Sequence, residues 1–432
     1  MNATRTAIIG AGRTVLSAVR MSAPNSAVVG ARRRSEVPLP AHVSADTTIG
    51  GVRLLIVADG IPNRDPELGD GSSMISFEII RSLPAEIAVT LVTLGSTHDI
   101  PEVVSARCER VVTFGKRRHE VALFRSLFSR LQVAAEERSV AGVRACVREL
   151  SAKSDVTLLH GPHIPFVGRY VRGPMVMQVV DPWSIRMEME ARHSAGLVGA
   201  YKRFKAGRVL ALEQSIPARA RLLTVGREDA ARWSGRLHRA VRGIANGVDH
   251  AERVPREPGP PVVCFVGSLN YAPNIDSVTI LVEQIAPLVW RDLPETRFTI
   301  AGRQPAKAVT DLRRPGVEIL ANVPSMTDVF NSADVAAFPD REGLGIRNSV
   351  REALGAGIPV VATAAAAREV ESQELLTTAE EPAAIAAEIV RLLRAAGSTA
   401  ENRAGDVVTW RSWKNATAEY LDELELAHAT SS

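Results

Sequence analysis

A glycine-containing loop before a predicted helix is the part of the sequence whose residue types point most directly to chemistry. Residues 343–363 read GLGIRNSVREALGAGIPVVAT, and they follow the apolar run DVAAFPD at 334–340. Gly343 and Gly345 let the backbone approach a ligand closely, and a helix beginning near Arg347 would present free backbone N–H groups. These groups and the positive end of the helix dipole favour a phosphate at this position.

Two side chains of this stretch extend the phosphate hypothesis. Arg347 offers a positive charge and a planar fork of donors for phosphate oxygens. Glu352 lies five residues further along the helix and points elsewhere, where an acid would suit two adjacent hydroxyls such as those of a ribose. The alternative is a simple helix start with Glu352 on a solvated face, and a GxG sequence alone does not decide between the two.

The elements around this loop alternate between apolar runs and helical segments, in two series. This alternation predicts an α/β protein with two doubly wound domains, whose ligands bind at the carboxyl ends of the strands. Two facing domains therefore predict a cleft between them. Strands are predicted at 52–59, 88–95, 110–115, 155–161, 175–181 and 221–226, then, after the linker REPGPP, at 262–267, 297–302, 316–320, 334–340 and 359–363.

The totals exclude several classes of protein. A formal net charge of +4 over 432 residues is too small an excess to predict nucleic-acid binding. Cys108, Cys146 and Cys264 are odd in number and far apart, which indicates a reducing compartment such as the cytoplasm and no metal site. No apolar run approaches the roughly 18 to 20 residues that a membrane span needs.

Residues 1–48 differ from the rest of the chain. They hold six arginines, no lysine and no acid before Glu36, and Gly10 and Gly12 only imitate a dinucleotide-binding start. This composition predicts a poorly ordered tail, and a targeting or membrane-surface segment and a folded segment are the alternatives.

Four segments of the second half resemble family 4 glycosyltransferases of GT-B fold, in which two Rossmann-like domains face each other across a cleft. Upstream, TVGREDAARW and IANGVD resemble the family's domain junction, and VVDPWSIR resembles part of its first half. Near the end of the chain, VVTWRSWKNATAEYLDEL resembles the family's closing segment. The resemblance covers about residues 52–427 and rests on order and spacing. The four segments are FVGSLNYAPNIDSV, RFTIAGRQP, NVPSMTDVFNSADVAAFP and GLGIRNSVREALGAGIPVVAT.

The resemblance implies a domain organisation. We expect an Arg-rich tail at 1–48, an acceptor domain at 49–245 and a nucleotide-sugar-binding domain at 246–408. A last helix at 409–432 would cross back onto the first domain.

It also implies a donor site, in which the glycine loop holds the diphosphate and Glu352 binds the ribose. Glu342 and Glu352 have nine residues between them rather than the family's usual seven, and Ser349 stands where the matching branch has lysine. The family's Arg/Lys pair is absent from GSLNYAPN, where Ser268 and Asn270 are neutral hydrogen-bonding groups, and Arg303 is the nearby cation. The implied donor-binding residues are Gly343, Gly345, Ile346, Arg347, Asn348, Glu352, Ser268, Asn270 and Arg303.

Three further groups come from the first half of the chain. His160 and His163 follow a strand, where family members place a catalytic-cleft histidine that contacts the donor sugar. The alternatives are structural or exposed histidines and, with poor spacing, a metal site. Asp181 also follows a strand and would orient an acceptor hydroxyl or act as a base, or else cap a helix. A glycine loop holds Gly69, Gly71 and Ser72. It resembles the family's loop that faces the transferred sugar and the acceptor, and an ordinary loop is the alternative.

Residues 117–132 form a predicted helix with a strongly apolar face beside arginines. Leu123, Phe124, Leu127, Phe128 and Leu131 share that face, and residues 201–208 form a second basic stretch. Each segment suits an anionic membrane or a core-facing helix, and the core-facing interpretation is slightly favoured.

The resemblance implies a glycosyltransferase of the hexosyltransferase type. It would move a sugar from a nucleotide-diphosphate donor to a hydroxyl acceptor, a glycan, lipid-linked molecule or small metabolite, with retention and without metal or cofactor. A GT-B nucleotide-sugar epimerase and a non-catalytic GT-B subunit are the rivals. We expect a cytoplasmic protein, with peripheral contact at the inner face of the membrane.

Overall fold

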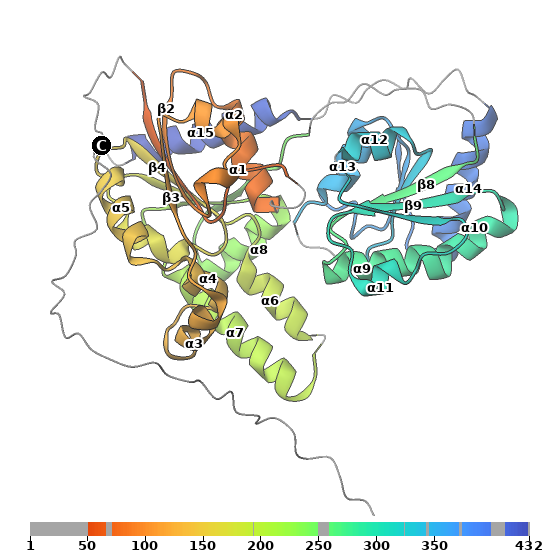
Figure 1. The fold of residues 1–432 in the computed structure, drawn as a ribbon, viewed down its shortest axis with the longest axis horizontal. Coiled ribbons are helices and arrows are strands. Elements are labelled where there is room, and N and C mark those ends of the chain that lie inside the picture. Colours follow the sequence, from red (N-terminus) through yellow and green to blue (C-terminus); the bar gives the residue numbers. More distant parts are fainter. Residues whose placement is uncertain are drawn as a thin grey trace, which may run out of the picture. The chain divides into compact units, whose positions relative to one another are not determined.

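The structure is a computed structural model (Figure 1). The predictions for residues 1–48, Gly69 and Gly343 concern residues outside its described ranges. The structure describes residues 51–65, 71–192, 194–248, 259–323, 325–342, 345–370, 374–398 and 411–430.

The first sheet is parallel throughout, with strand order β3-β2-β1-β4-β5-β6-β7. Its central strands β1, β4 and β5 are mostly apolar and almost entirely buried, because a parallel sheet is covered on both faces. The strands are β1 (Arg53–Ala58), β2 (Ala88–Leu94), β3 (Arg110–Phe114), β4 (Val156–His160), β5 (Met175–Gln178), β6 (Arg221–Thr224) and β7 (Val241–Gly243).

Helices cover both faces of the first sheet. Alternate residues of β1 enter different cores, with Leu55 and Val57 in one cluster and Leu54 and Ile56 in the other. The helices are α1 (Gly71–Ser82), α2 (Glu102–Arg107), α3 (His119–Phe128), α4 (Val133–Arg138), α5 (Ala141–Ser151), α6 (Trp183–Arg192), α7 (Gly196–Gln214) and α8 (Arg227–Leu237).

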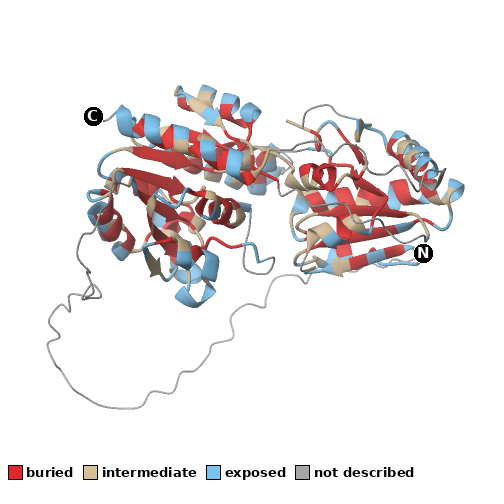
Figure 2. Ribbon diagram, turned by 90° about the horizontal axis from the view of Figure 1, so that it is seen from above, coloured by how far each residue is buried: buried red, intermediate tan, exposed pale blue. Residues whose placement is uncertain are grey.

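The second sheet is also parallel, with strand order β10-β9-β8-β11-β12-β13. Figure 2 shows buried residues concentrated along the strands of both sheets. The strands are β8 (Val262–Val266), β9 (Arg297–Gly302), β10 (Val317–Ala321), β11 (Val335–Phe338), β12 (Val360–Ala362) and β13 (Leu376–Thr378). Its helices are α9 (Ala272–Ile280), α10 (Ala286–Asp292), α11 (Lys307–Thr310), α12 (Met326–Asn331), α13 (Asn348–Gly355) and α14 (Pro382–Ser398).

The last helix, α15 (Trp413–Ala429), packs on the core of the first sheet although it follows the second sheet in sequence. The hydroxyl of its Tyr420 accepts a hydrogen bond from Gln178 Nε2 on β5 at 2.6 Å. Its Glu423 is 2.6 Å from both Arg221 and Arg242. The prediction of an α/β protein with two doubly wound parallel sheets is confirmed.

A buried carboxylate joins three helices of the first sheet. Glu213, near the end of α7, accepts hydrogen bonds from Ser184 N at 3.0 Å, Ser184 Oγ at 2.5 Å and Trp233 Nε1 at 2.9 Å. Burial raises its pKa, while the bonds from Ser184 and Trp233 oppose that rise. Three donors therefore depend on one acceptor inside the core.

We predict that Glu213→Ala lowers the free energy of unfolding by about 3 kcal/mol, because it leaves these donors unsatisfied. Urea denaturation would measure the loss, with Glu283→Ala at an exposed position as the control, expected to change stability by less than about 0.5 kcal/mol. Equal stability of the two variants would contradict the prediction.

Candidate active site

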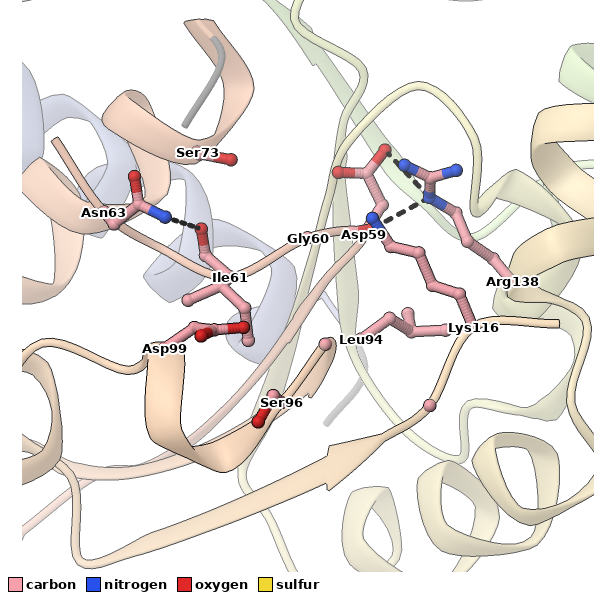
Figure 3. A pocket seen from close by; sticks show the side chains of 12 residues that line it. Asp59, Gly60, Ile61, Asn63, Ser73, Leu94, Ser96, Asp99, Lys116 and Arg138 are labelled. Carbon is pink, nitrogen blue, oxygen red and sulfur yellow. Dashed lines mark hydrogen bonds and ion pairs between the residues drawn. The ribbon is translucent and has the colours of Figure 1, made fainter. Parts of the chain in front are cut away.

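The carboxyl end of the first sheet holds a cavity of about 450 Å³. It opens where β1, β2 and β3 end, because these strands are parallel and their ends meet at one edge. Its walls carry both signs of charge as well as neutral hydrogen-bonding groups, as Figure 3 shows. The lining residues are Asp59, Gly60, Ile61, Asn63, Ser73, Leu94, Gly95, Ser96, Asp99, Gly115, Lys116 and Arg138.

Asp59, directly after β1, is the buried acid of this cavity. Its carboxylate oxygen Oδ2 accepts from His163 N at 3.3 Å and lies 3.9 Å from Arg138 Nε. Arg138 Nε also donates to the Asp59 carbonyl at 2.8 Å. Gly161 has φ +125°, and a Cβ there would lie 2.1 Å from the Asp59 carboxyl carbon, so only glycine fits. Asp59 and Arg138 were not among the residues predicted from the sequence, although an acid following the first strand is a readable signal.

The structure brings two predicted groups together at the end of β4. His160 is buried, and its Nδ1 lies 3.5 Å from the hydroxyl of Ser72. Gly71 and Ser72 are the first two residues of α1. The Ser72 side chain therefore faces the strand-end histidine.

His163 is half-buried beside the same edge. Its Nδ1 lies 3.3 Å from Gln132 Nε2, and its ring meets Trp183 edge-to-face with centroids 4.5 Å apart. Burial, followed by the charges of Arg138, Lys116 and Arg186, lowers the pKa of His163 well below its usual value. The imidazole is therefore neutral near pH 7 and has both a donor and an acceptor nitrogen.

Asp181 follows a strained residue at the end of β5. Val180 has φ +64°, a value that a β-branched residue rarely adopts. The Val180 carbonyl accepts from Thr224 Oγ1 at 2.6 Å and Val225 N at 3.0 Å, which holds the strained backbone in place. Such strain clusters at functional sites. Burial raises the pKa of Asp181 to about 6, against the charge of Arg186.

The described end of the glycine loop lies against this acid. Gly345 has φ +69°, and a Cβ at that position would be 2.6 Å from Asp181 Oδ1. Its N–H donates to Asp229 Oδ2 on α8 at 2.6 Å. Glycine is needed here both for the backbone angle and for the close approach. A carboxylate thus already accepts from one amide of the loop. Asp229 was not among the residues predicted from the sequence.

Arg347 is held within the second sheet's own core. Its side chain is 13% exposed, forms an ion pair with Asp340 after β11, and donates from Nη1 to Asn274 Oδ1 at 3.1 Å. The guanidinium lies 5.0 Å from the Phe265 ring centroid and 4.8 Å from that of Phe338. Among the described residues, its buried Nε and Nη2 atoms have no hydrogen-bond partner. Two charged donors therefore remain for a ligand.

The other predicted donor-site residues form a connected set near Arg347. Arg303 Nε donates to Ser268 Oγ at 2.7 Å, and Asn270 Nδ2 donates to Gln304 Oε1 at 2.7 Å. Asn274, the partner of Arg347, donates to the Ser268 carbonyl at 2.9 Å. The ends of β8, β9 and β11 thus share one network.

The remaining predicted residues lie on or before α13. Ile346 packs on a core cluster of the first sheet, and Asn348 Oδ1 accepts from Asn246 Nδ2 at 3.1 Å. Glu352 is half-buried within α13. The described residues contain no group of three or more His, Cys, Asp or Glu side chains placed to hold a metal ion.

Comparisons with known proteins relate this geometry to a family. Residues 260–395 match the family model described as glycosyl transferases group 1. A comparison with curated proteins gives no match.

Solved structures share the fold over most of the chain. The Anabaena protein HepE in complex with UDP and glucose has a TM-score of 0.59 and 13% identity, over 87% of this chain and 100% of its own. Sucrose-phosphate synthase from Thermosynechococcus elongatus has a TM-score of 0.59 and 16% identity, over 88% and 100%. A glycosyltransferase from Rickettsia africae has a TM-score of 0.58 and 10% identity, over 88% and 99%. The chain therefore has the GT-B fold, and its residues 260–395 match the family model described as glycosyl transferases group 1.

Proposed function

We propose that the protein transfers a sugar from a nucleotide-diphosphate donor to a hydroxyl acceptor. The observation that carries the proposal is the pair of unpartnered guanidinium atoms of Arg347, in the part of the chain that matches glycosyltransferases. Buried donors without an acceptor are rare in folded proteins, and an anionic ligand would satisfy them. UDP is the first nucleotide to test, because the similar HepE structure contains it.

The donor's diphosphate is assigned to Arg347, Ser268, Arg303 and the amides at the start of α13. Arg347 Nε and Nη2 would bind phosphate oxygens, and Glu352 would bind the ribose hydroxyls. When the bond from the anomeric carbon to the phosphate oxygen breaks, negative charge develops on the diphosphate. Fixed donors in a buried site stabilise that charge.

The acceptor is assigned to the cavity beside Asp59, and the catalytic groups to the strand ends next to it. Neutral His163, together with His160 and Ser72, would hydrogen-bond sugar hydroxyls. Asp181 in its ionised form would accept the proton of the acceptor hydroxyl as that oxygen bonds to the anomeric carbon. Retention of configuration, independence of metal and transfer of a hexose belong to the same proposal.

A second candidate is a non-catalytic GT-B subunit. Two observations favour it, namely the ion pair of Arg347 with Asp340 and the presence of Ser349 where the related branch has lysine. The same surface would then bind a nucleotide weakly or not at all.

Thermal unfolding with UDP, GDP, ADP and dTDP tests the donor site. We predict that one nucleotide stabilises the full chain by about 2.7 kcal/mol at 100 times its Kd, because it binds only the folded state. No shift with any of the four would favour the non-catalytic subunit.

Turnover of a panel of nucleotide sugars separates the remaining functions. Transfer or slow hydrolysis would release the nucleoside diphosphate. Epimerisation would instead give a new sugar with the nucleotide still attached, and it would need no acceptor.

We also propose that the protein is cytoplasmic and makes peripheral contact with the membrane. The three cysteines are buried and free. Within the described ranges, no helix combines the length and apolarity needed to cross a membrane.

A further inference from the structure

Helix α3 turns its large apolar side chains outward. Its buried residues are Ala122 and Ser126, while Phe124, Leu127 and Phe128 are exposed, with Phe128 at 80%. The rings of Phe124 and Phe128 contact each other with centroids 5.4 Å apart. This arrangement contradicts the core-facing interpretation of the segment. An exposed apolar patch of this kind marks an interaction surface.

Helix α7 exposes a second apolar row. Leu197 is 91% exposed, and Val198, Tyr201 and Phe204 are also exposed. Positions 197, 201 and 204 follow the helical repeat, so they lie on one face. Ala206, Val209 and Leu212 face the protein instead.

One arginine fastens the two helices together. Arg208 on α7 donates to the carbonyls of Ser126 and Leu131 at 2.6 Å each, and also to that of Ser129. The end of α3 is thus held against the middle of α7 (Figure 1). The exposed apolar side chains of these two adjacent helices are together called the α3–α7 face: Val121, Leu123, Phe124, Leu127, Phe128, Leu197, Val198, Tyr201 and Phe204.

The α3–α7 face is basic as well as apolar. Residues 196–212 contain four basic residues and no acid. Near α3, Arg118, Arg125 and Arg130 are exposed. Arg118 pairs with Glu120 at 3.7 Å and Arg125 pairs with Glu136 at 3.1 Å, so the excess charge comes mainly from α7. Aromatic and aliphatic side chains mixed with Lys and Arg are typical of surfaces that enter the interface of an anionic bilayer.

We propose that the α3–α7 face docks on the surface of an anionic lipid bilayer. Charge complementarity selects this occupant. A second copy would place an equally basic face against the α3–α7 face, and the two faces would repel each other. Residues 1–48 carry six arginines, so the α3–α7 face would repel them as well.

The docked face connects directly to the candidate active site. Leu131, whose carbonyl Arg208 holds, precedes Gln132, and the Gln132 side chain contacts His163. Docking would bring the acceptor side of the site close to the lipid surface. The docking proposal stands without the proposed transfer reaction, since it rests on the surface alone.

Vesicle flotation of the full chain tests the proposal. We expect binding to vesicles of phosphatidylcholine with 30% phosphatidylglycerol and much weaker binding to pure phosphatidylcholine. Leu127→Asp/Phe128→Asp should reduce partitioning by about 100-fold, because both apolar side chains leave the bilayer. Lys202→Gln/Arg203→Gln/Lys205→Gln should also reduce it by about 100-fold, at about fivefold per charge. Val103→Asp, half-exposed on α2, is the matched control and should bind like the parent.

Three results would overturn the proposal. The first is absence of binding to anionic vesicles by the parent chain. The second is full binding by both α3–α7 variants, which would assign the membrane contact to residues 1–48. The third is a parent dimer in light scattering that the Leu127→Asp/Phe128→Asp variant converts to a monomer, which would assign the face to a second copy. Nucleotide-induced thermal shifts should be unchanged in all variants, so failure of docking is distinct from failure of the proposed function.

Discussion

Arg347→Met is expected to lower the free energy of unfolding by about 3 to 5 kcal/mol. The substitution removes the partner of a buried acid, since Asp340 is 5% exposed and pairs with this guanidinium. Ser277 Oγ also donates to Asp340 at 2.7 Å, but one hydroxyl does not replace a full charge. An uncompensated charge in the core is among the largest single-site destabilisations known. Urea denaturation of the full chain would measure the effect.

A double substitution separates the charge from the packing. Arg347→Met/Asp340→Asn removes both charges, so it should recover most of the stability that Arg347→Met loses. Recovery of less than half would assign the loss to packing between Phe265 and Phe338 instead. A loss below about 1 kcal/mol in Arg347→Met alone would show that the ion pair does not form.

Measurements of nucleotide affinity separate the structural role of Arg347 from its proposed role in binding. Asp340→Asn keeps the guanidinium and should leave the Kd for the bound nucleotide unchanged or lower. The double variant, once shown to be folded, should bind about 100-fold more weakly, the effect of losing two charge-assisted hydrogen bonds. Equal affinities would restrict Arg347 to the core.

The alternation of strands and helices was readable because buried parallel strands are continuous apolar runs. The first strand of each series, at 52–59 and 262–267, is found as β1 and β8. The edge strands β7 and β13 were not predicted. Each has three residues, none of them buried, so neither carries the apolar run that marks a central strand.

Helix α3 shows why a periodic pattern does not fix what the pattern faces. Leu123, Phe124, Leu127 and Phe128 share a face as expected, and that face is exposed. The periodicity of an amphipathic helix is the same whether its partner is a core or a membrane. Only the tertiary position of α3, with Ala122 and Ser126 inward, decides between them.

In the candidate site, the residues that follow strands could be predicted from the sequence. The residues that contact these strand ends from distant helices could not. His160 lies at the end of its strand, and Asp181 follows β5 closely. Arg138 and Asp229 come from helices far away in the sequence, so no local pattern links them to the strand ends. The pairing of Arg347 with Asp340 is different, because both flank the same loop and their opposite charges were visible.

Burial of Asp181 gives it a distinct effect on folding. Its pKa rises from an ordinary 3.8 to about 6, so the folded protein holds this proton more tightly than the unfolded chain does. The contribution of Asp181 to stability is therefore highest below about pH 4 and decreases as the pH rises to about 6. Asp181→Asn removes this dependence, and at pH 7 the variant should be at least as stable as the parent.

The same substitution should abolish most of the proposed transfer, because amide nitrogen cannot take the acceptor's proton. We expect kcat to fall by about 100-fold to 10,000-fold, the usual contribution of a general base. In the parent, the rate should fall about tenfold for each pH unit below about 6, since only the ionised form of Asp181 acts. The residual rate of Asp181→Asn should be flat over that range, and nucleotide binding should persist. A parent rate independent of pH between 5 and 7, or a variant that keeps the acidic limb, would assign the proton transfer to another group.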